Sequence, residues 1–262
     1  MQEQFPFQDL EFGPLRPWSI RSLVQRSLEL TWGSFGTIAM IATLVALPVF
    51  LCLNYFEPWT WFDEHQMLWK VIFYGDANTL FGALVAPAVL YAVAERMRSG
   101  ADPGLGASLA WGLRRWPRLI GYRIAIGVFF LLGTLALVVP GVMVLLRYSL
   151  VTPLAGLDLD PDDNPMRRSA ALVRGHAWEL LGAAALLFAG VMVAAMVLSV
   201  ANGFVLGLLI RLISDTPTLV IHQKMWVIES VGNAIYTVCA APLTVLCLVV
   251  CLAWRREARA QP

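Results

Sequence analysis

The chain has 262 residues, of which 58% are hydrophobic and 14% are charged, and its formal net charge is +1. Soluble domains carry about 25% charged residues, so this deficit indicates a protein whose main solvent is lipid. The near-neutral balance argues against a nucleic-acid partner, because nucleic-acid binding calls for a basic surface.

A membrane-spanning helix needs about 20 mainly apolar residues. Apolar runs predict six spans, in chain order, over residues 35–56, 76–95, 119–139, 142–157, 179–200 and 231–254. The third and fourth are separated at Pro140-Gly141, because one helix over 119–157 would overshoot the bilayer and this dipeptide favours a tight turn. The fourth is the shortest of the six, so a re-entrant helix there stays open as an alternative.

These spans make up a predicted membrane domain over 17–254, between an N-terminal tail of 1–16 and a C-terminal tail of 255–262. The N-terminal stretch MQEQFPFQDLEFGPL has no apolar segment of the signal-peptide kind. Insertion is therefore expected to be directed by the first span.

Arginine gathers on one predicted side of the membrane. It lies before the first span, between the second and third, between the fourth and fifth, and after the last: Arg16, Arg21, Arg26, Arg96, Arg98, Arg114, Arg115, Arg118, Arg167, Arg168, Arg174, Arg255, Arg256 and Arg259. The opposite side carries only Lys70, Arg211 and Lys224. The positive-inside rule therefore predicts that both termini are cytoplasmic. Tryptophans near span ends, such as Trp32 and Trp254, fit an aromatic belt.

Three segments share one plan: SLVQRSLELTWGSFG (22–36), SLAWGLRRWPRLIG (108–121) and SAALVRGHAWELLG (169–182). Each begins with serine, carries arginine, reaches a tryptophan and precedes an apolar run. In the first, Arg21, Gln25 and Glu29 share one helical face, which is typical of an amphipathic helix lying in the membrane interface. The predicted fold is therefore an all-α integral membrane protein built from three repeats, each an interfacial amphipathic helix followed by a transmembrane hairpin.

LRRWPRLIG, PGVMVLLRYSLVTPL and NPMRRSAALVRGHAWEL together resemble a bacterial membrane family. Its members include the membrane domain of glycerophosphoryl diester phosphodiesterases and stand-alone relatives of unknown function. The resemblance covers roughly residues 17–254 and implies a multi-pass protein of the bacterial inner membrane. In the fused members a separate soluble barrel performs the hydrolysis. This chain has no room for that barrel, so the resemblance implies a fold and a location but no activity.

No residue pattern in the chain supports catalysis. The sequence contains no Ser-His-Asp pattern, no H-E-x-x-H and no phosphate-binding glycine loop. Its four cysteines lie in apolar runs without a C-x-x-C pair, and His176 in RGHAWEL is interpreted as structural. We therefore expect a protein that is not an enzyme and that uses no metal and no cofactor.

The acidic stretch DLDPDDNP (158–165) begins like a calcium loop but departs from that motif at its sixth and twelfth positions, Asp163 and Ser169. Asn164 is instead expected to cap a helix, with Pro165 at its first position. The favoured interpretation is a capped, solvated loop balanced by Arg167 and Arg168. A divalent-cation site is the weaker alternative.

Arg147 is the charged residue inside the predicted span 142–157. It lies about 9 Å beyond the predicted turn at 1.5 Å per residue, which would place it near the outer interface. A structural ion pair with Glu229 or Asp76 is favoured there, and contact with a ligand or a lipid phosphate is the alternative. On the opposite side, Arg114, Arg115 and Arg118 are candidates to bind anionic lipid headgroups.

The leading function hypothesis is a non-enzymatic multi-pass inner-membrane protein that organises or senses lipid, or assists an unidentified protein partner. The basic, aromatic interfacial segments motivate it. A small-molecule transporter or permease that uses the Arg147 region is the second hypothesis, because spans interrupted by glycine and proline are a transporter feature. A membrane-embedded lipid enzyme is the third.

Overall fold

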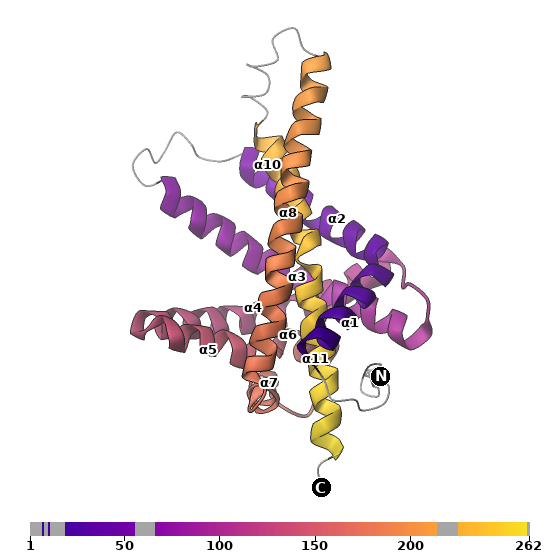
Figure 1. The fold of residues 1–262 in the computed structure, drawn as a ribbon, viewed down its shortest axis with the longest axis vertical. Helices are drawn as coiled ribbons and strands as arrows, with labels where there is room; N and C mark the ends of the chain where they lie inside the picture. The colour runs from indigo at the N-terminus through magenta and orange to yellow at the C-terminus, as the bar shows by residue number, and fades with distance from the viewer. Residues whose placement is uncertain (1–6, 8–9, 11–18, 56–65, 214–224, 261–262) are drawn as a thin grey trace.

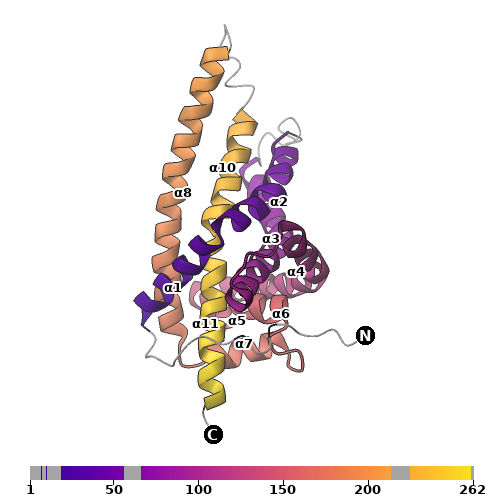
Figure 2. The ribbon, with the colours of Figure 1, turned by 90° about the vertical axis from the view of Figure 1, so that its right-hand side faces the viewer.

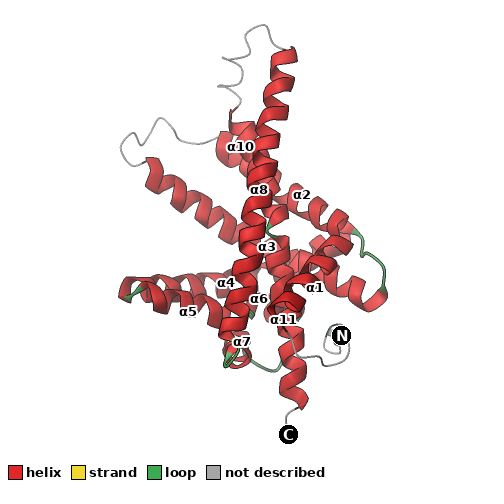
Figure 3. Cartoon of the chain, viewed as in Figure 1, coloured by secondary structure: helices red, strands yellow, loops and turns green. Residues whose placement is uncertain are grey.

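The computed structural model describes residues 7, 10, 19–55, 66–213 and 225–260, which form helices and short connections (Figure 3). The helices in chain order are α1 (Ile20–Gly33), α2 (Phe35–Tyr55), α3 (Gln66–Ser99), α4 (Leu105–Ala136), α5 (Val138–Tyr148), α6 (Val151–Leu157), α7 (Pro165–Val173), α8 (Ala177–Ile213), α10 (Met225–Cys239) and α11 (Ala241–Ala260).

Six helical stretches among the described residues are long and apolar enough to cross a membrane. They are Phe35–Asn54, Leu80–Ser99, Leu105–Leu135, Val139–Leu157, Ala177–Leu209 and Val227–Arg259. For the described residues, the prediction of an all-α fold with six apolar helical stretches of membrane-spanning length is confirmed.

The long helices do not form a parallel bundle. In Figure 1, α8 runs upright beside the α10–α11 pair, whereas the α4–α5 hairpin extends crosswise to them. Figure 2, turned by 90°, still shows α8, α10 and α11 upright and looks along the hairpin. Helix α1 contacts α11 and α8, so elements from both ends of the sequence meet at the centre of the molecule.

Helix α4 is continuous where the sequence predicted an interfacial helix over 108–121 followed by a separate span. Pro117 lies inside it without ending it. The helix ends instead at Leu137, whose backbone is extended (φ −170°, ψ 150°). The hairpin therefore turns at Leu137. The sequence-based prediction of a turn at Pro140-Gly141 is wrong. Pro140 is tolerated in the first turn of α5 because the first N–H groups of a helix have no intrahelical acceptor.

Glycines on both sides of this turn, Gly133 and Gly141, bring α4 and α5 together. A Cβ added to Gly133 would lie 3.0 Å from the backbone nitrogen of Gly141, and one added to Gly141 would collide with Thr134. Any larger side chain at either position would force the two helix backbones apart.

The fourth predicted span is broken in the structure. Helix α5 ends at Tyr148, and α6 begins at Val151 and is almost completely buried. The Ser169 hydroxyl of α7 donates a hydrogen bond to the Arg147 carbonyl oxygen (2.8 Å) and accepts one from the Leu150 amide (3.3 Å). One side chain thus satisfies two backbone groups at the break.

The main core lies where α1, α2, α3, α6, α7, α8 and α11 meet. Phe7, from the predicted N-terminal tail, is completely buried there and meets the rings of Tyr91 and Trp111 edge to face. Trp254 is also buried and stacks on His176, with ring centroids 5.0 Å apart. It therefore packs inside the protein and does not take the belt position expected from the sequence.

Candidate functional site

Asp158 binds two of the arginines that the sequence offered as lipid ligands. It follows α6 in the left-handed region (φ 48°) and is only 2% exposed. Its carboxylate forms ion pairs with Arg115 and with Arg118 Nη1, the latter at 2.6 Å. The prediction of a solvated acidic loop is therefore wrong at this residue.

Asp160 joins the same loop to two further helices. Its carboxylate accepts from Arg255 Nη2 (2.7 Å) on α11 and from Arg168 Nε (3.1 Å) on α7. Arg255 is 3% exposed and also donates to the Leu159 carbonyl oxygen (2.6 Å). Asn164 accepts from the Met166 amide (2.9 Å) with Pro165 in the first turn of α7, so the predicted cap is confirmed.

Trp111 supports this arrangement from α4. Its indole N–H donates to the Gly156 carbonyl oxygen (2.8 Å), and the Arg115 guanidinium lies over its ring, 4.9 Å from the centroid. We call Arg115, Arg118, Asp158, Asp160, Arg168 and Arg255 the arginine–aspartate cluster. It fastens α4, α7 and α11 to the loop after α6. Arg114 is exposed on α4. A role for Arg114, Arg115 and Arg118 in binding lipid headgroups stays a prediction.

Arg147 is exposed on α5, with its guanidinium 5.9 Å from the ring centroid of Tyr148. Its carbonyl group contacts Ser169 of α7, which directly precedes α8. Glu229 lies toward the other end of α8, because the neighbouring Ile228 carbonyl accepts from Asn202 (3.2 Å). Asn202 is roughly 37 Å along α8 from Ala177 at 1.5 Å per residue.

Arg147 and Glu229 therefore lie far apart, and among the described residues no ion pair joins them. Asp76 lies on α3, and its side chain is outside the described residues. An Arg147–Asp76 pair stays a prediction.

An apolar groove runs between α1, α2, α8 and α10, with a volume of about 1050 Å³. Its walls are aliphatic for most of their length, and Leu28, Leu187, Val191, Leu198 and Ile235 are among the lining residues. Glu29 and Trp32 lie at the α1 wall, and Pro242 lies where α10 gives way to α11.

The α1 wall of the apolar groove carries charge as well as aromatic surface. Glu29 accepts hydrogen bonds from Gln25 Nε2 (3.0 Å) and Arg26 Nη1 (3.0 Å), which lower the pKa of its carboxyl group. Trp32 is 77% exposed and stacks on Phe35, with centroids 5.5 Å apart. An exposed tryptophan beside fixed charge is typical of a helix at a membrane–water interface.

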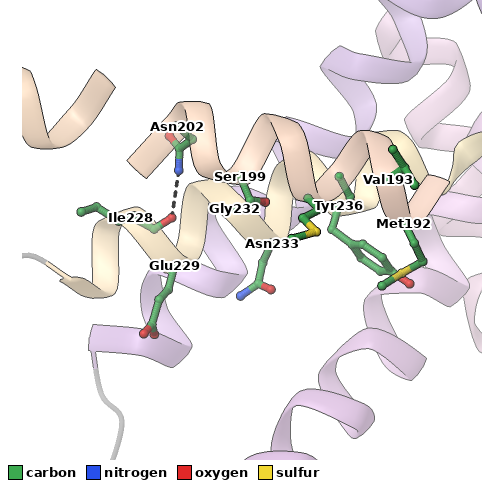
Figure 4. A pocket seen from close by; sticks show the side chains of 11 residues that line it. Met192, Val193, Ser199, Asn202, Ile228, Glu229, Gly232, Asn233 and Tyr236 are labelled. Atoms are coloured by element: carbon green, nitrogen blue, oxygen red, sulfur yellow. Dashed lines mark hydrogen bonds between the residues drawn. The ribbon is translucent and has the colours of Figure 1, made fainter. Parts of the chain in front are cut away.

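A second groove, of about 780 Å³, lies on the other side of the α8–α10 contact. Its lining includes Ser199, Asn202, Glu229, Asn233 and Tyr236 (Figure 4). One helix pair thus separates an apolar groove from a groove that has polar residues along part of its lining.

Sequence reasoning missed Phe7, Trp111 and the polar face of α10. Nothing in the residues around Phe7 or Trp111 indicates their burial or contacts, because their partners are distant in sequence. The polar face of α10 could have been found from the sequence, because Glu229, Asn233 and Tyr236 recur at helical spacing.

Comparison of the chain with protein-family models, with curated proteins and with solved structures finds no match.

Proposed function

We propose that this protein binds membrane lipid in the apolar groove and senses or organises the lipid around it. In this proposal it is a non-enzymatic, multi-pass protein of the inner membrane with both termini in the cytoplasm. A protein partner that reads the lipid-bound state is compatible with the same role.

The observation that carries the proposal is the shape and lining of the apolar groove. Any apolar face on the lipid-exposed surface of a membrane protein meets lipid, but a flat face touches an acyl chain from one side only. A lipid acyl chain lying in this groove would contact several helices at once and gain dispersion contacts with each. The volume of about 1050 Å³ lies just above the range of about 300–1,000 Å³ that small-molecule sites occupy.

The position of α1 supports lipid over another apolar ligand. The groove extends from α1, with its charged Arg26 and Glu29, along α8 and along α10, which begins the candidate span Val227–Arg259. An amphiphile aligned with the membrane would place its headgroup beside α1 and its chain along α8. Exposed Arg167 and Arg174, on or next to α7, add positive charge on the predicted cytoplasmic side.

The test is to fill the groove. Gly190 lines it, and a Cβ there would meet nothing within 4 Å. We expect Gly190→Trp to retain several-fold less phospholipid than the wild type after purification, measured by native mass spectrometry. A phospholipid with a photoactivatable acyl chain should likewise label the variant less.

Gly203→Trp is the matched control, because Gly203 also lies on α8 with open space around its Cβ but does not line the apolar groove. It should retain lipid as the wild type does. Equal lipid retention by both variants and the wild type would overturn the proposal.

A further inference from the structure

Helix α10 carries a polar stripe on the face that lines the second groove. Glu229, Asn233 and Tyr236 follow one another at spacings of four and three residues, so they share one helical face. In Figure 4, Glu229 and Asn233 extend from the same side of α10. Ser230 and Ala234 belong to another face, where the Ser230 hydroxyl accepts from Asn54 Nδ2 (2.8 Å) on α2.

Helix α8 supplies the facing wall. Asn202 Nδ2 donates to the Ile228 carbonyl oxygen and holds the two helices together at one end of the groove. Gly232 faces Ser199 on α8, and a Cβ added there would make an ordinary van der Waals contact with Ser199 Oγ at 3.8 Å. Further along α8 the lining becomes apolar and polarisable, with Met192 and Met196. The groove therefore has a polar end at Glu229 and Asn202 and an apolar end at the methionines.

The polar stripe lies within a candidate membrane span, with Glu229 and Tyr236 exposed and Asn233 half-buried. Glu229 is the charged residue among those lining the groove and, within the described part of the chain, has no ion pair or hydrogen bond to another side chain. It lies in the first turns of the candidate span Val227–Arg259, and Tyr236 lies roughly 10 Å deeper at 1.5 Å per residue. Ionisable and amide groups facing hydrocarbon are costly, and they mark substrate or ion pathways in membrane proteins.

We infer that this groove binds an organic cation, a protonated amine attached to an apolar body. The Glu229 carboxylate balances the ammonium charge and accepts a hydrogen bond from it, and the Asn233 side-chain oxygen accepts a second one. The body of the ligand lies against Met192, Met196 and the Tyr236 ring. An anionic ligand is disfavoured because the described lining residues include no cation and would place it beside Glu229.

The inference is independent of the lipid proposal, because the two grooves lie on opposite sides of the α8–α10 contact and share no lining residue. Loss of lipid from the apolar groove in Gly190→Trp would leave amine binding intact. Failure of one proposal is therefore distinguishable from failure of the other.

The test uses the full chain in nanodiscs of zwitterionic lipid, with n-octylammonium as the probe and n-octanol as its uncharged counterpart. Equilibrium dialysis against empty nanodiscs corrects for partition into lipid. We expect saturable binding of the amine, weakened about tenfold or more in Glu229→Gln, because a charge-assisted hydrogen bond is lost without a change of shape. Asn233→Leu should weaken it less, and octanol should show no saturable binding.

Glu257→Gln is the matched control, since it removes a carboxylate from α11 outside the groove. It should bind the amine as the wild type does. Wild-type binding by Glu229→Gln, saturable binding of octanol, or no saturable amine binding at all would each overturn the inference. A wild-type dimer that Asn233→Leu dissociates would overturn it too, because the stripe would then be a subunit interface.

Discussion

Asp158 shows how a single residue can determine the packing around it. A residue other than glycine in the left-handed region has an energetic cost, and aspartate is among those that tolerate it best. Here that conformation turns the carboxylate toward Arg115, which is itself only 13% exposed. Removing one partner of a buried pair leaves an uncompensated charge, which is more costly than never having formed the pair.

We therefore expect Asp158→Asn to destabilise the protein by about 3 kcal/mol. Asparagine keeps the size of the side chain and tolerates the left-handed backbone, so the loss reports on charge. Thermal unfolding in detergent, followed by tryptophan fluorescence, measures the effect. The control is Asp162→Asn, an exposed residue of the same loop, which should leave the midpoint unchanged. A midpoint for Asp158→Asn equal to that of the control would contradict the structural role of the cluster.

At the scale of elements, the sequence predicted the helices better than their ends. The predicted span 35–56 corresponds closely to α2, whereas α8 continues to Ile213, well beyond the predicted end at residue 200. The turn between α4 and α5 is at Leu137 because Pro140 is compatible with a helix's first turn, so proline did not mark the break. The proximity of Gly133 and Gly141 appears only once the two helices are paired.

We expect Gly141→Ala to lower stability by about 1–3 kcal/mol, because the new methyl group collides with Thr134 across the hairpin. Gly127→Ala is the control in α4, where an added Cβ meets nothing within 4 Å. It should be neutral or stabilising, since alanine favours helix over glycine. The two unfolding midpoints, compared in the same detergent, decide the matter. Equal effects would show that the hairpin does not pack as described.

At the scale of the whole molecule, the crosswise orientation of the α4–α5 hairpin is a feature that the positions of the predicted spans do not reveal. It was not foreseen because hydropathy measures how apolar a segment is and not how segments cross. Both ends of the α4–α5 hairpin lie on the same side of the membrane, whether the hairpin crosses the membrane or turns back within it. The predicted sidedness of the termini is the same in both cases.

We expect cysteines placed at Asp102 and Asp162 to react with a membrane-impermeant maleimide only in inverted vesicles. A cysteine at Arg211, in the last turn of α8, should react only in right-side-out vesicles. The positive-inside bias is the reason, and a background without the four native cysteines is needed. Labelling of Asp102→Cys and Arg211→Cys from the same side would contradict the topology.

By itself the sequence determined the helical class and the approximate place of six apolar stretches long enough to cross a membrane, because these follow from local hydropathy. It also predicted the Asn164 cap, which depends on neighbouring residues alone. The tertiary structure decided the partners of the charges. Arg115 and Arg118 bind Asp158, and Arg147 lies beside α7, far from Glu229. Electrostatic pairing depends on distance through space, and residues separated by many positions in the chain meet only after the helices have packed.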